Sequence, residues 1–527
     1  MRRRALLAAG ATAALAAPRL APAQNARVLR FVPQSDLAVL DPIWTPAYVT
    51  RNHGFLVFDT LFGQGADFSV SPQMAAGAAA EDGGKAWTVT LRDGLRFHDG
   101  EPVLARDCVA SLRRWGRRDS FGQALMAATD ELSAPDDRTL RFRLKRPFPL
   151  LPDALGKTGS NMPAIMPERL ARADAFAQIT EMVGSGPYRF KADERVAGSR
   201  VVYERFAGYV PREGGTPDFT AGPKVARFDR VEWRVMPDSS TAASALRNGE
   251  VDWWENPSAD LLPLLRRARG VRVEVLDRTG LVGMMRPNHL HPPFDNAAVR
   301  RAVMRAVNQA DFMAAAGGSD PALTRTGVGV FCPVSPMAND AGMEALNGPR
   351  DLDRARRELR EAGYRGERVV FLGVTDLTTV NAISEVGADL LRRLGMNVDY
   401  QAMDWGTAVQ RRVKREPPDQ GGWNVAATYW SGIDTFNPAV QISLRGNGAA
   451  GWWGWPTFER MEALRDAWLE APDLAAQQRI AREMQAHFFE VVPYWPLGLL
   501  HSPTAYRADL SGVQRGFALF WNVRRGA

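Results

Sequence analysis

The chain has 527 residues, of which 45% are hydrophobic and 24% are charged; these values are typical of globular proteins and exclude disordered, collagen-like and coiled-coil chains. The length is about three times that of a typical single domain and predicts two or three lobes, each with its own core. The formal net charge is +7, and removing the four arginines among residues 1–23 leaves +3 (7 − 4), so no nucleic-acid partner is expected.

The first 23 residues have the pattern of a signal peptide. Arginines occupy 2–4, an Ala/Leu/Gly run covers 5–17, and Ala-Pro-Ala stands at 21–23. The apolar run is shorter than the ~20 residues that span a bilayer, and the small-x-small ending is typical of a cleavage site. The arginine pair also resembles a twin-arginine signal. We therefore expect an exported, periplasmic protein.

Only two cysteines occur, Cys108 and Cys332. A lipoprotein needs a cysteine directly after its cleavage site, so the sequence predicts a protein that is free in the periplasm. Cys108 occupies an apolar position on a predicted helix. Two separate buried thiols are therefore expected rather than a disulfide.

The first part of the mature chain shows alternating strands and one clear helix. Strands are predicted where apolar and polar residues alternate, and a helix where the spacing becomes helical. In chain order the predicted elements are a strand at 28–32, a turn at 40–42, an apolar stretch at 54–62, a strand at 87–91, a turn at 92–94, a helix at 102–115 and a strand at 139–144.

Helices and strands alternate more regularly in the second half, which predicts an α/β lobe. Asp295 is the expected cap of a helix whose apolar positions run from Val299 to Val307, and Gly395 is expected to end another. The remaining predicted elements are a strand at 368–374, helices at 379–394, 457–469 and 474–489, and a strand at 398–403.

Sequence patterns for catalysis or cofactor binding are missing. No Gly-x-Ser-x-Gly, Ser-x-x-Lys or His-Glu-x-x-His occurs, so a hydrolase is disfavoured. The segment 156–158 lacks the first glycine of a phosphate loop, and the glycine-rich 446–451 leads into tryptophans where a helix should begin. His289 and His291 are poorly spaced for a metal. No cofactor or metal is expected.

Residues 91–102 (Leu-Arg-Asp-Gly-Leu-Arg-Phe-His-Asp-Gly-Glu-Pro) and 105–112 closely resemble the signature of family 5 extracellular solute-binding proteins, which serve ABC importers and include dipeptide-, oligopeptide- and nickel-binding proteins. His98 in this stretch is expected to pack or hydrogen-bond within its turn rather than contact a ligand. Further segments resemble the family in the same order, at 184–188, 293–302, 355–364 and 493–497.

The resemblance implies an α/β fold, namely a two-lobed periplasmic binding protein clamshell with an extra α+β domain in the first lobe. By analogy the first lobe comprises 27–60, 180–285 and 500–527, the extra domain 61–179, and the second lobe 286–499. It also implies a monomer that is not an enzyme, a small solute in the cleft between the lobes, and the permease subunits of an ABC importer as partner.

In peptide-binding members of this family, an aspartate in a Trp-x-Gly-Asp segment pairs with the α-ammonium group of the peptide. The matching segment here is 429–438, with Tyr429, Trp430, Gly432 and Asp434 as candidate ligand contacts. Ile433 is an extra residue in the motif, which weakens the peptide assignment. A buried carboxylate suits an ammonium group, whereas the alternative is an aspartate that caps a turn.

Other candidate ligand contacts are aromatic or polar. Indole rings can line a pocket or pack in a core; the pocket is favoured for Trp405 and Trp430, and both readings stay open for Trp452 and Trp453. The further candidates are Trp405, Trp452, Trp453, His53, Gly54, Ser160, Asn161 and Asn288. The ligand could be a peptide, an opine, a chelate, glutathione or a sugar. A periplasmic sensor or a holdase chaperone that uses the same cleft is the alternative function.

Overall fold

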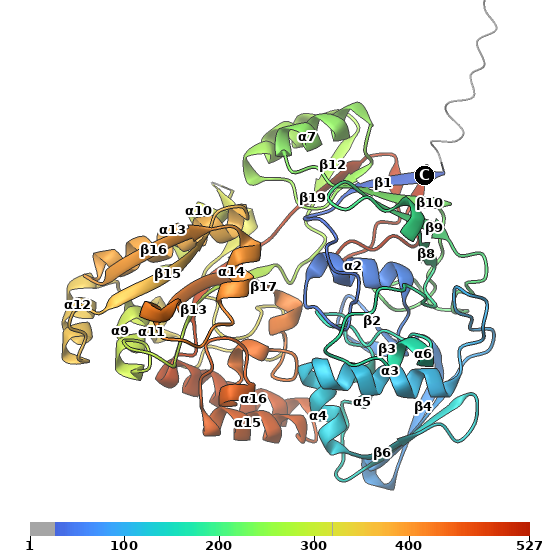
Figure 1. Ribbon diagram of the computed structural model, residues 1–527, viewed down its shortest axis with the longest axis horizontal. Helices are drawn as coiled ribbons and strands as arrows, with labels where there is room; N and C mark the ends of the chain where they lie inside the picture. Colours follow the sequence, from blue (N-terminus) through green and yellow to red (C-terminus); the bar gives the residue numbers. More distant parts are fainter. Residues whose placement is uncertain (1–26, 319, 527) are drawn as a thin grey trace, which may run out of the picture.

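Two large sheets divide the described part of the chain, residues 27–318 and 320–526 of the computed structural model, into two lobes (Figure 1). The seven-stranded sheet of the first lobe has the order β12-β19-β11-β1-β10-β9-β8. Its strands are β1 (Val28–Val32), β8 (Tyr188–Phe190), β9 (Arg200–Arg205), β10 (Arg230–Arg234), β11 (Trp253–Trp254), β12 (Val271–Glu274) and β19 (Thr504–Arg507). The helices of this lobe are α2 (Tyr48–Val57), α7 (Ser239–Asn248) and α8 (Leu262–Arg267). The predicted signal peptide, residues 1–23, lies outside the described residues.

The second lobe is built on a six-stranded sheet of order β14-β18-β13-β17-β15-β16. Its strands are β13 (Leu281–Pro287), β14 (Thr324–Arg325), β15 (Arg368–Val374), β16 (Asn397–Met403), β17 (Val425–Ser431) and β18 (Trp495–Leu500). The helix α13 (Thr378–Arg393) connects the parallel strands β15 and β16. The other helices are α9 (Ala297–Ala306), α10 (Gln309–Gly317), α11 (Glu344–Asn347), α12 (Leu352–Glu361), α14 (Trp405–Arg411), α15 (Glu459–Leu469) and α16 (Leu474–Val491).

A smaller domain, the extra domain, lies beside the first lobe and reaches the end of the second lobe that carries α15 and α16 (Figure 1). It has an antiparallel sheet of order β4-β5-β7-β6. Leu140, Phe142 and Leu144 of β7 are buried while Arg141 and Arg143 are exposed, the pattern of a sheet with one face covered. Its elements are β4 (Ala75–Glu81), β5 (Ala86–Leu91), β6 (Thr129–Ser133), β7 (Thr139–Leu144), α3 (Ala105–Arg118), α4 (Ser120–Ala128), α5 (Leu151–Leu155) and α6 (Glu168–Ala171).

Two chain crossings join the lobes: 275–280, between β12 and β13, and 501–503, between β18 and β19. The strand β13 begins at Leu281, ahead of the predicted lobe limit at 286, because Leu281 already pairs with Ser431 and Leu500 of the second lobe. The domain limits as a whole stay predictions.

Several local predictions are confirmed. The strands expected at 28–32, 139–144 and 368–374 have the predicted bounds, and α13 lies within one residue of the expected helix at 379–394. The cap of α9 differs, since Asn296 rather than Asp295 accepts the backbone N–H of Ala298. Both residue types can cap a helix, and the backbone bends one position later than expected.

His98 lies inside the fold, as expected. Its Nε2 is 3.0 Å from the carbonyl oxygen of Gly186, and the N–H of Gly184 donates to its Nδ1 over 3.4 Å. This contact joins two of the segments by which the sequence resembles the family. Cys108 and Cys332 are two separate buried thiols. Among the described helices, none has the length and apolar character needed to cross a membrane.

Candidate ligand site between the lobes

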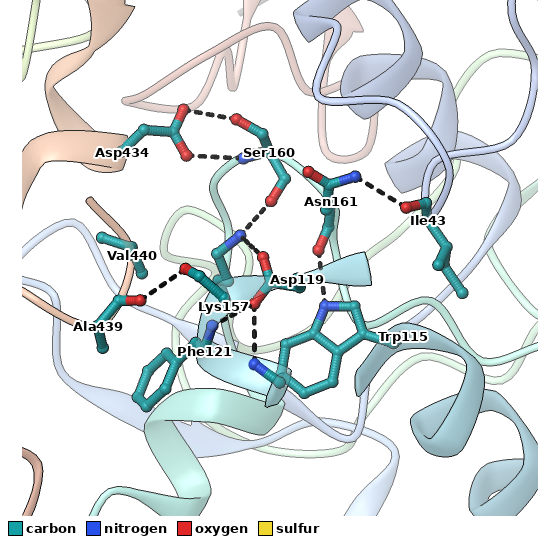
Figure 2. Close-up of polar contacts among 12 residues, drawn as sticks. Ile43, Trp115, Asp119, Phe121, Lys157, Ser160, Asn161, Asp434, Ala439 and Val440 are labelled. Atoms are coloured by element: carbon teal, nitrogen blue, oxygen red, sulfur yellow. Dashed lines mark hydrogen bonds and ion pairs between the residues drawn. The ribbon is translucent and has the colours of Figure 1, made fainter. Parts of the chain in front are cut away.

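Asp434 reaches from the second lobe to the extra domain (Figure 2). It lies in a short 3-10 turn directly after β17, and 5% of its surface is exposed. The backbone N–H of Ser160 donates to Oδ1 over 2.9 Å, and the hydroxyl of Ser160 donates to Oδ2 over 2.8 Å. Two sequence-predicted candidates are therefore brought together across the boundary between the lobes.

A buried ion pair holds the loop that carries Ser160. Lys157 Nζ lies 2.5 Å from Asp119 Oδ2, and both side chains are almost completely buried. The same ammonium group donates to the carbonyl oxygen of Ser160. Asp119 in turn caps α4 by accepting the N–H groups of Phe121 and Gly122. This chain of contacts, drawn in Figure 2, fixes the loop before it meets Asp434.

The rest of the loop is shaped for the same contact. Asn161 has a positive φ of 52°, its carbonyl oxygen accepts from Trp115 Nε1 over 2.7 Å, and its side chain donates to the carbonyl oxygen of Ile43. A Cβ atom at Gly159 would lie 2.3 Å from Asp434 Oδ1. The carboxylate can therefore approach only because residue 159 has no side chain.

A second contact between the lobes lies near the first. The backbone N–H of Ser431, the last residue of β17, donates to the hydroxyl of Tyr48 on α2 over 2.6 Å. Burial and the neighbouring carboxylate of Asp434 raise the pKa of the Tyr48 hydroxyl well above its ordinary value. Tyr48 therefore stays neutral and accepts this bond at all physiological pH values.

A cavity of about 70 Å³, here called the crossing cavity, lies where both chain crossings pass between the lobes. The crossings contribute Leu276, Asp277, Gly280 and Ser502, and β17 of the second lobe contributes Ser431. The first lobe contributes polar and aromatic side chains that include Gln34, Tyr48, Arg51, Glu255 and Phe517. A group bound there would contact both lobes and both hinge segments.

Buried charges surround this cavity. The guanidinium carbon of Arg51 lies 3.7 Å from the centre of the Phe517 ring. Glu255 accepts from the backbone N–H of Gln34 over 2.8 Å and from Asn52 Nδ2 over 2.7 Å. Burial raises the pKa of Glu255, and these two bonds together with the charge of Arg51 oppose that rise.

A second hollow lies elsewhere. It has a volume of about 420 Å³ and is lined by α3, α6 and neighbouring residues of the extra domain. None of its lining residues belongs to the second lobe. A ligand that closes a clamshell must contact both lobes, so this hollow does not qualify as the inter-lobe site.

Three of the other predicted candidates lie inside the lobes. His53 is fully buried in the first lobe, with Nδ1 2.9 Å from the Tyr203 hydroxyl and Nε2 3.4 Å from the sulfur of Met182. Gly54 follows it on α2 and packs against neighbouring side chains. Asn288 is fully buried in the second lobe and donates to the carbonyl oxygen of Trp423.

Three of the four tryptophan candidates, Trp430, Trp452 and Trp453, form one cluster of tilted rings in the second lobe. Trp452 lies 5.3 Å from Trp430 and 4.0 Å from Trp453, measured between ring centres. Trp405 begins α14 separately, with the guanidinium of Arg412 4.8 Å from its ring. None of these rings lines the crossing cavity.

Two further candidates of the 429–438 segment lie close to the lobe boundary. The N–H of Gly432 donates to the carbonyl oxygen of Gly280, in the first crossing, over 2.7 Å. Burial and, to a smaller extent, the charge of Glu255 in the first lobe together raise the pKa of Tyr429 to about 12. The segment thus faces the first lobe at several points.

Sequence reasoning missed the four ionisable residues of the crossing cavity: Tyr48, Arg51, Glu255 and Asp277. They come from a helix, the end of a strand and a crossing that are far apart in the chain. No local motif joins them, so only the fold could have found them.

Two α/β lobes joined by two crossings, with polar contacts and a charged cavity between them, define a clamshell binding protein. Comparison with known proteins agrees. The model of the family described as bacterial extracellular solute-binding proteins, family 5 middle, matches residues 69–452. The chain belongs to this family, whose members bind solutes and are not enzymes.

Curated relatives cover most of the chain. It is 37% identical, over 99% of both sequences, to a "probable peptide ABC transporter periplasmic-binding protein" of Sinorhizobium fredii. It is 27% identical, over 82% of this chain and 79% of the relative, to a glutathione-binding protein of Pectobacterium atrosepticum.

Solved structures share the fold. A periplasmic binding protein of Agrobacterium tumefaciens in complex with agropinic acid is 20% identical, with a TM-score of 0.79 over 95% of this chain and 99% of that one. A peptide-bound periplasmic binding protein of Helicobacter pylori is also 20% identical, with a TM-score of 0.77 over 95% and 98% of the two chains. At this identity the likeness concerns the fold.

Proposed function

We propose that this protein is the periplasmic binding component of an ABC importer. It takes a peptide-like solute into the cleft between its lobes and delivers it to a membrane permease. The proposal draws on the family, on the names of the relatives in Sinorhizobium and Pectobacterium, and on the predicted signal peptide. The protein acts as a monomer that is free in the periplasm.

The buried carboxylate of Asp434 is the observation that carries the ligand assignment. A carboxylate offers about four lone-pair positions to donors. Ser160 uses two of them, one on each oxygen. The others suit the ammonium group of a ligand, and a charge-assisted bond there provides both affinity and orientation. Asp434 can thus link the ligand, the second lobe and the extra domain.

Closure then follows from contacts that exist only when the lobes meet. Ser160 and Asp434, like Tyr48 and Ser431, come from opposite sides of the boundary and can bond only in the closed arrangement. A ligand that adds contacts on both sides shifts the population further toward that state. The permease then recognises the surface that the protein presents when its lobes are closed.

A thermal-shift screen of the purified protein tests the proposal. The probes are di- and tripeptides, opines, glutathione, oligosaccharides and nickel chelates. A ligand at 100 times its Kd stabilises the folded state by about 2.7 kcal/mol, which raises the melting temperature measurably. A selective rise with amine-bearing solutes is the expected result. A response to sugars or chelates alone would overturn the peptide-like assignment.

The variant Asp434→Asn tests the residue itself. It removes the charge but keeps the size, and we expect an amine-bearing ligand to lose about 1.5–3 kcal/mol of binding free energy in calorimetry. The matched control is Asp389→Asn, which changes an exposed aspartate of the second lobe. Unchanged affinity in Asp434→Asn would remove this residue from the site.

A further inference from the structure

Arg51 of α2 has an unused donor at the crossing cavity. Only 5% of its surface is exposed, and Nη1 has no hydrogen-bond partner. Nε and Nη2 make long contacts of 3.4 and 3.3 Å with Oδ1 of the adjacent Asn52. Among the described residues, no carboxylate lies within 4.0 Å of the guanidinium group, although Arg51 lines the cavity.

A buried guanidinium group with an unused donor is energetically unfavourable unless a ligand supplies an acceptor. A buried cation without a carboxylate partner loses its hydration and gains little in return. Burial lowers the pKa of Arg51, and the charges of Asp434, Asp277 and Glu255 oppose that change from a distance. The rings of Phe517 and Tyr48, at 3.7 and 4.8 Å from the guanidinium carbon, hold the group in place. The planar fork is oriented before any ligand arrives.

The charges around the cavity limit which ligand can bind. Asp277 and Glu255 line the cavity with Arg51, and Asp434 acts on Arg51 from beside it. One cation and two carboxyl groups therefore line the cavity, and a third carboxyl group lies near the cation. A ligand group with only a carboxylate would add a fourth negative charge, whereas one with only an ammonium group would leave Arg51 without a carboxylate partner. A ligand group that carries both charges can pair its carboxylate with Arg51 and its ammonium with the carboxyl groups.

The small size of the cavity requires the two charges to be close together. A volume of about 70 Å³ holds a few water molecules, so a larger ligand can place only one of its ends in this cavity. We infer that the crossing cavity binds an amino-acid head group, in which an ammonium and a carboxylate share one carbon atom, and that Arg51 binds the carboxylate. This inference rests on the proposed solute-binding function and specifies its ligand class. It favours γ-glutamyl compounds and opine-like amino acids over ordinary α-linked peptides.

Two isomeric dipeptides test the inference, γ-L-glutamyl-L-alanine and α-L-glutamyl-L-alanine. They have the same formula and net charge, but only the γ isomer keeps an ammonium and a carboxylate on one carbon. Isothermal titration calorimetry with the purified protein is expected to show at least tenfold tighter binding of the γ isomer. Equal affinities, a preference for the α isomer, or no binding of either would overturn the inference.

Variants at Arg51 connect the preference to this residue. Arg51→Gln is expected to weaken the γ isomer at least tenfold and the α isomer much less. Arg51→Lys keeps the charge and the packing of the stem, and it is expected to retain part of the preference because an ammonium group lacks the planar fork. The control is Arg172→Gln, an exposed arginine of the extra domain. A full preference in both Arg51 variants would overturn the role of Arg51.

The outcomes separate this inference from the function on which it rests. If the thermal-shift screen finds α-linked peptides as ligands while the isomer pair shows no γ preference, the solute-binding proposal stands and the head-group inference falls. If Arg51→Gln does not fold, the isomer comparison in the unaltered protein and in Arg51→Lys still decides the matter. Circular dichroism and melting temperatures identify that case.

Discussion

Two neighbouring regions between the lobes differ in how their buried charges are satisfied. In the network of Figure 2, Lys157, Asp119 and Asp434 each have short hydrogen bonds or an ion pair. At the crossing cavity, Arg51 keeps a donor without a partner. The first region stabilises the closed arrangement without a ligand, whereas the second gains its missing partner only when one binds. The unused donor of Arg51 at a cavity lined by both lobes is therefore the feature that points to a ligand.

The largest expected effect comes from breaking the satisfied region. Lys157→Met keeps a long apolar stem but leaves Asp119 as a buried carboxylate without its cation. Removing one partner of a buried pair costs about 3–5 kcal/mol. Urea unfolding followed by circular dichroism should show this loss as a lower transition midpoint.

The control for this prediction is an exposed pair of the same domain. Arg172→Met breaks the contact between Arg172 and Glu168, in which the arginine side chain is largely exposed. Surface pairs contribute at most about 1 kcal/mol, so this variant should unfold close to the unaltered protein. Equal stability of Lys157→Met and Arg172→Met would contradict the structural role of the buried pair.

A smaller effect is expected from Gly159→Ala, which acts on closure instead of folding. The added Cβ would lie 2.3 Å from Asp434 Oδ1, so the loop and the carboxylate cannot keep their contact. Overpacking of this kind costs about 2 kcal/mol, and opening the lobes relieves it. Ligand affinity should fall and the radius of gyration in small-angle scattering should rise, while the urea midpoint changes little.

Gly77→Ala is the matched control, because a Cβ there meets no atom within 4 Å. It should leave both affinity and radius of gyration unchanged. A Gly159→Ala protein that binds and closes normally would show that the approach of Asp434 to the loop is not needed for closure.

Regular elements could be predicted from the sequence because their period is local. The alternation at 139–144 and the apolar run at 368–374 each predict a strand with the observed bounds. The helix α2 was not predicted, although it carries Tyr48 and Arg51. Its segment includes Arg51, Asn52 and His53, and all three are buried. Polar residues on every face hide the helical period that a sequence pattern depends on.

The candidate site also has residues that the sequence indicates and residues that it does not. Asp434 and Ser160 could be named from the sequence, one from a family-like motif and one from a polar break, but their contact joins residues 274 positions apart. Arg51 has no motif at all. Its importance comes from what is missing around it, namely a partner for Nη1, and a sequence does not record the absence of a neighbour in space.

The helix α2 connects the cavity to the core of the first lobe and makes a third prediction possible. Arg51 lies at the cavity, while His53, two positions later, points into the core toward Tyr203 and Met182. Burial, with a smaller contribution from the charge of Arg195, lowers the pKa of His53 to about 3. His53 is therefore neutral in the folded protein over the whole range in which an unfolded histidine, with a pKa of about 6.5, takes up a proton.

This shift makes the first lobe less stable in acid. Above about pH 6.5 His53 is unprotonated in both the folded and the unfolded state, so it does not lower the free energy of unfolding there. Between about pH 6.5 and 3 only the unfolded state is protonated, so His53 lowers the free energy of unfolding by about 1.4 kcal/mol per pH unit. Comparing urea midpoints at pH 7.5 and 5.5 should show this loss, and His53→Gln should reduce the difference. A pH dependence that is identical in His53→Gln would place the acid sensitivity elsewhere, with His98, whose pKa burial lowers to about 4, as the next group to replace.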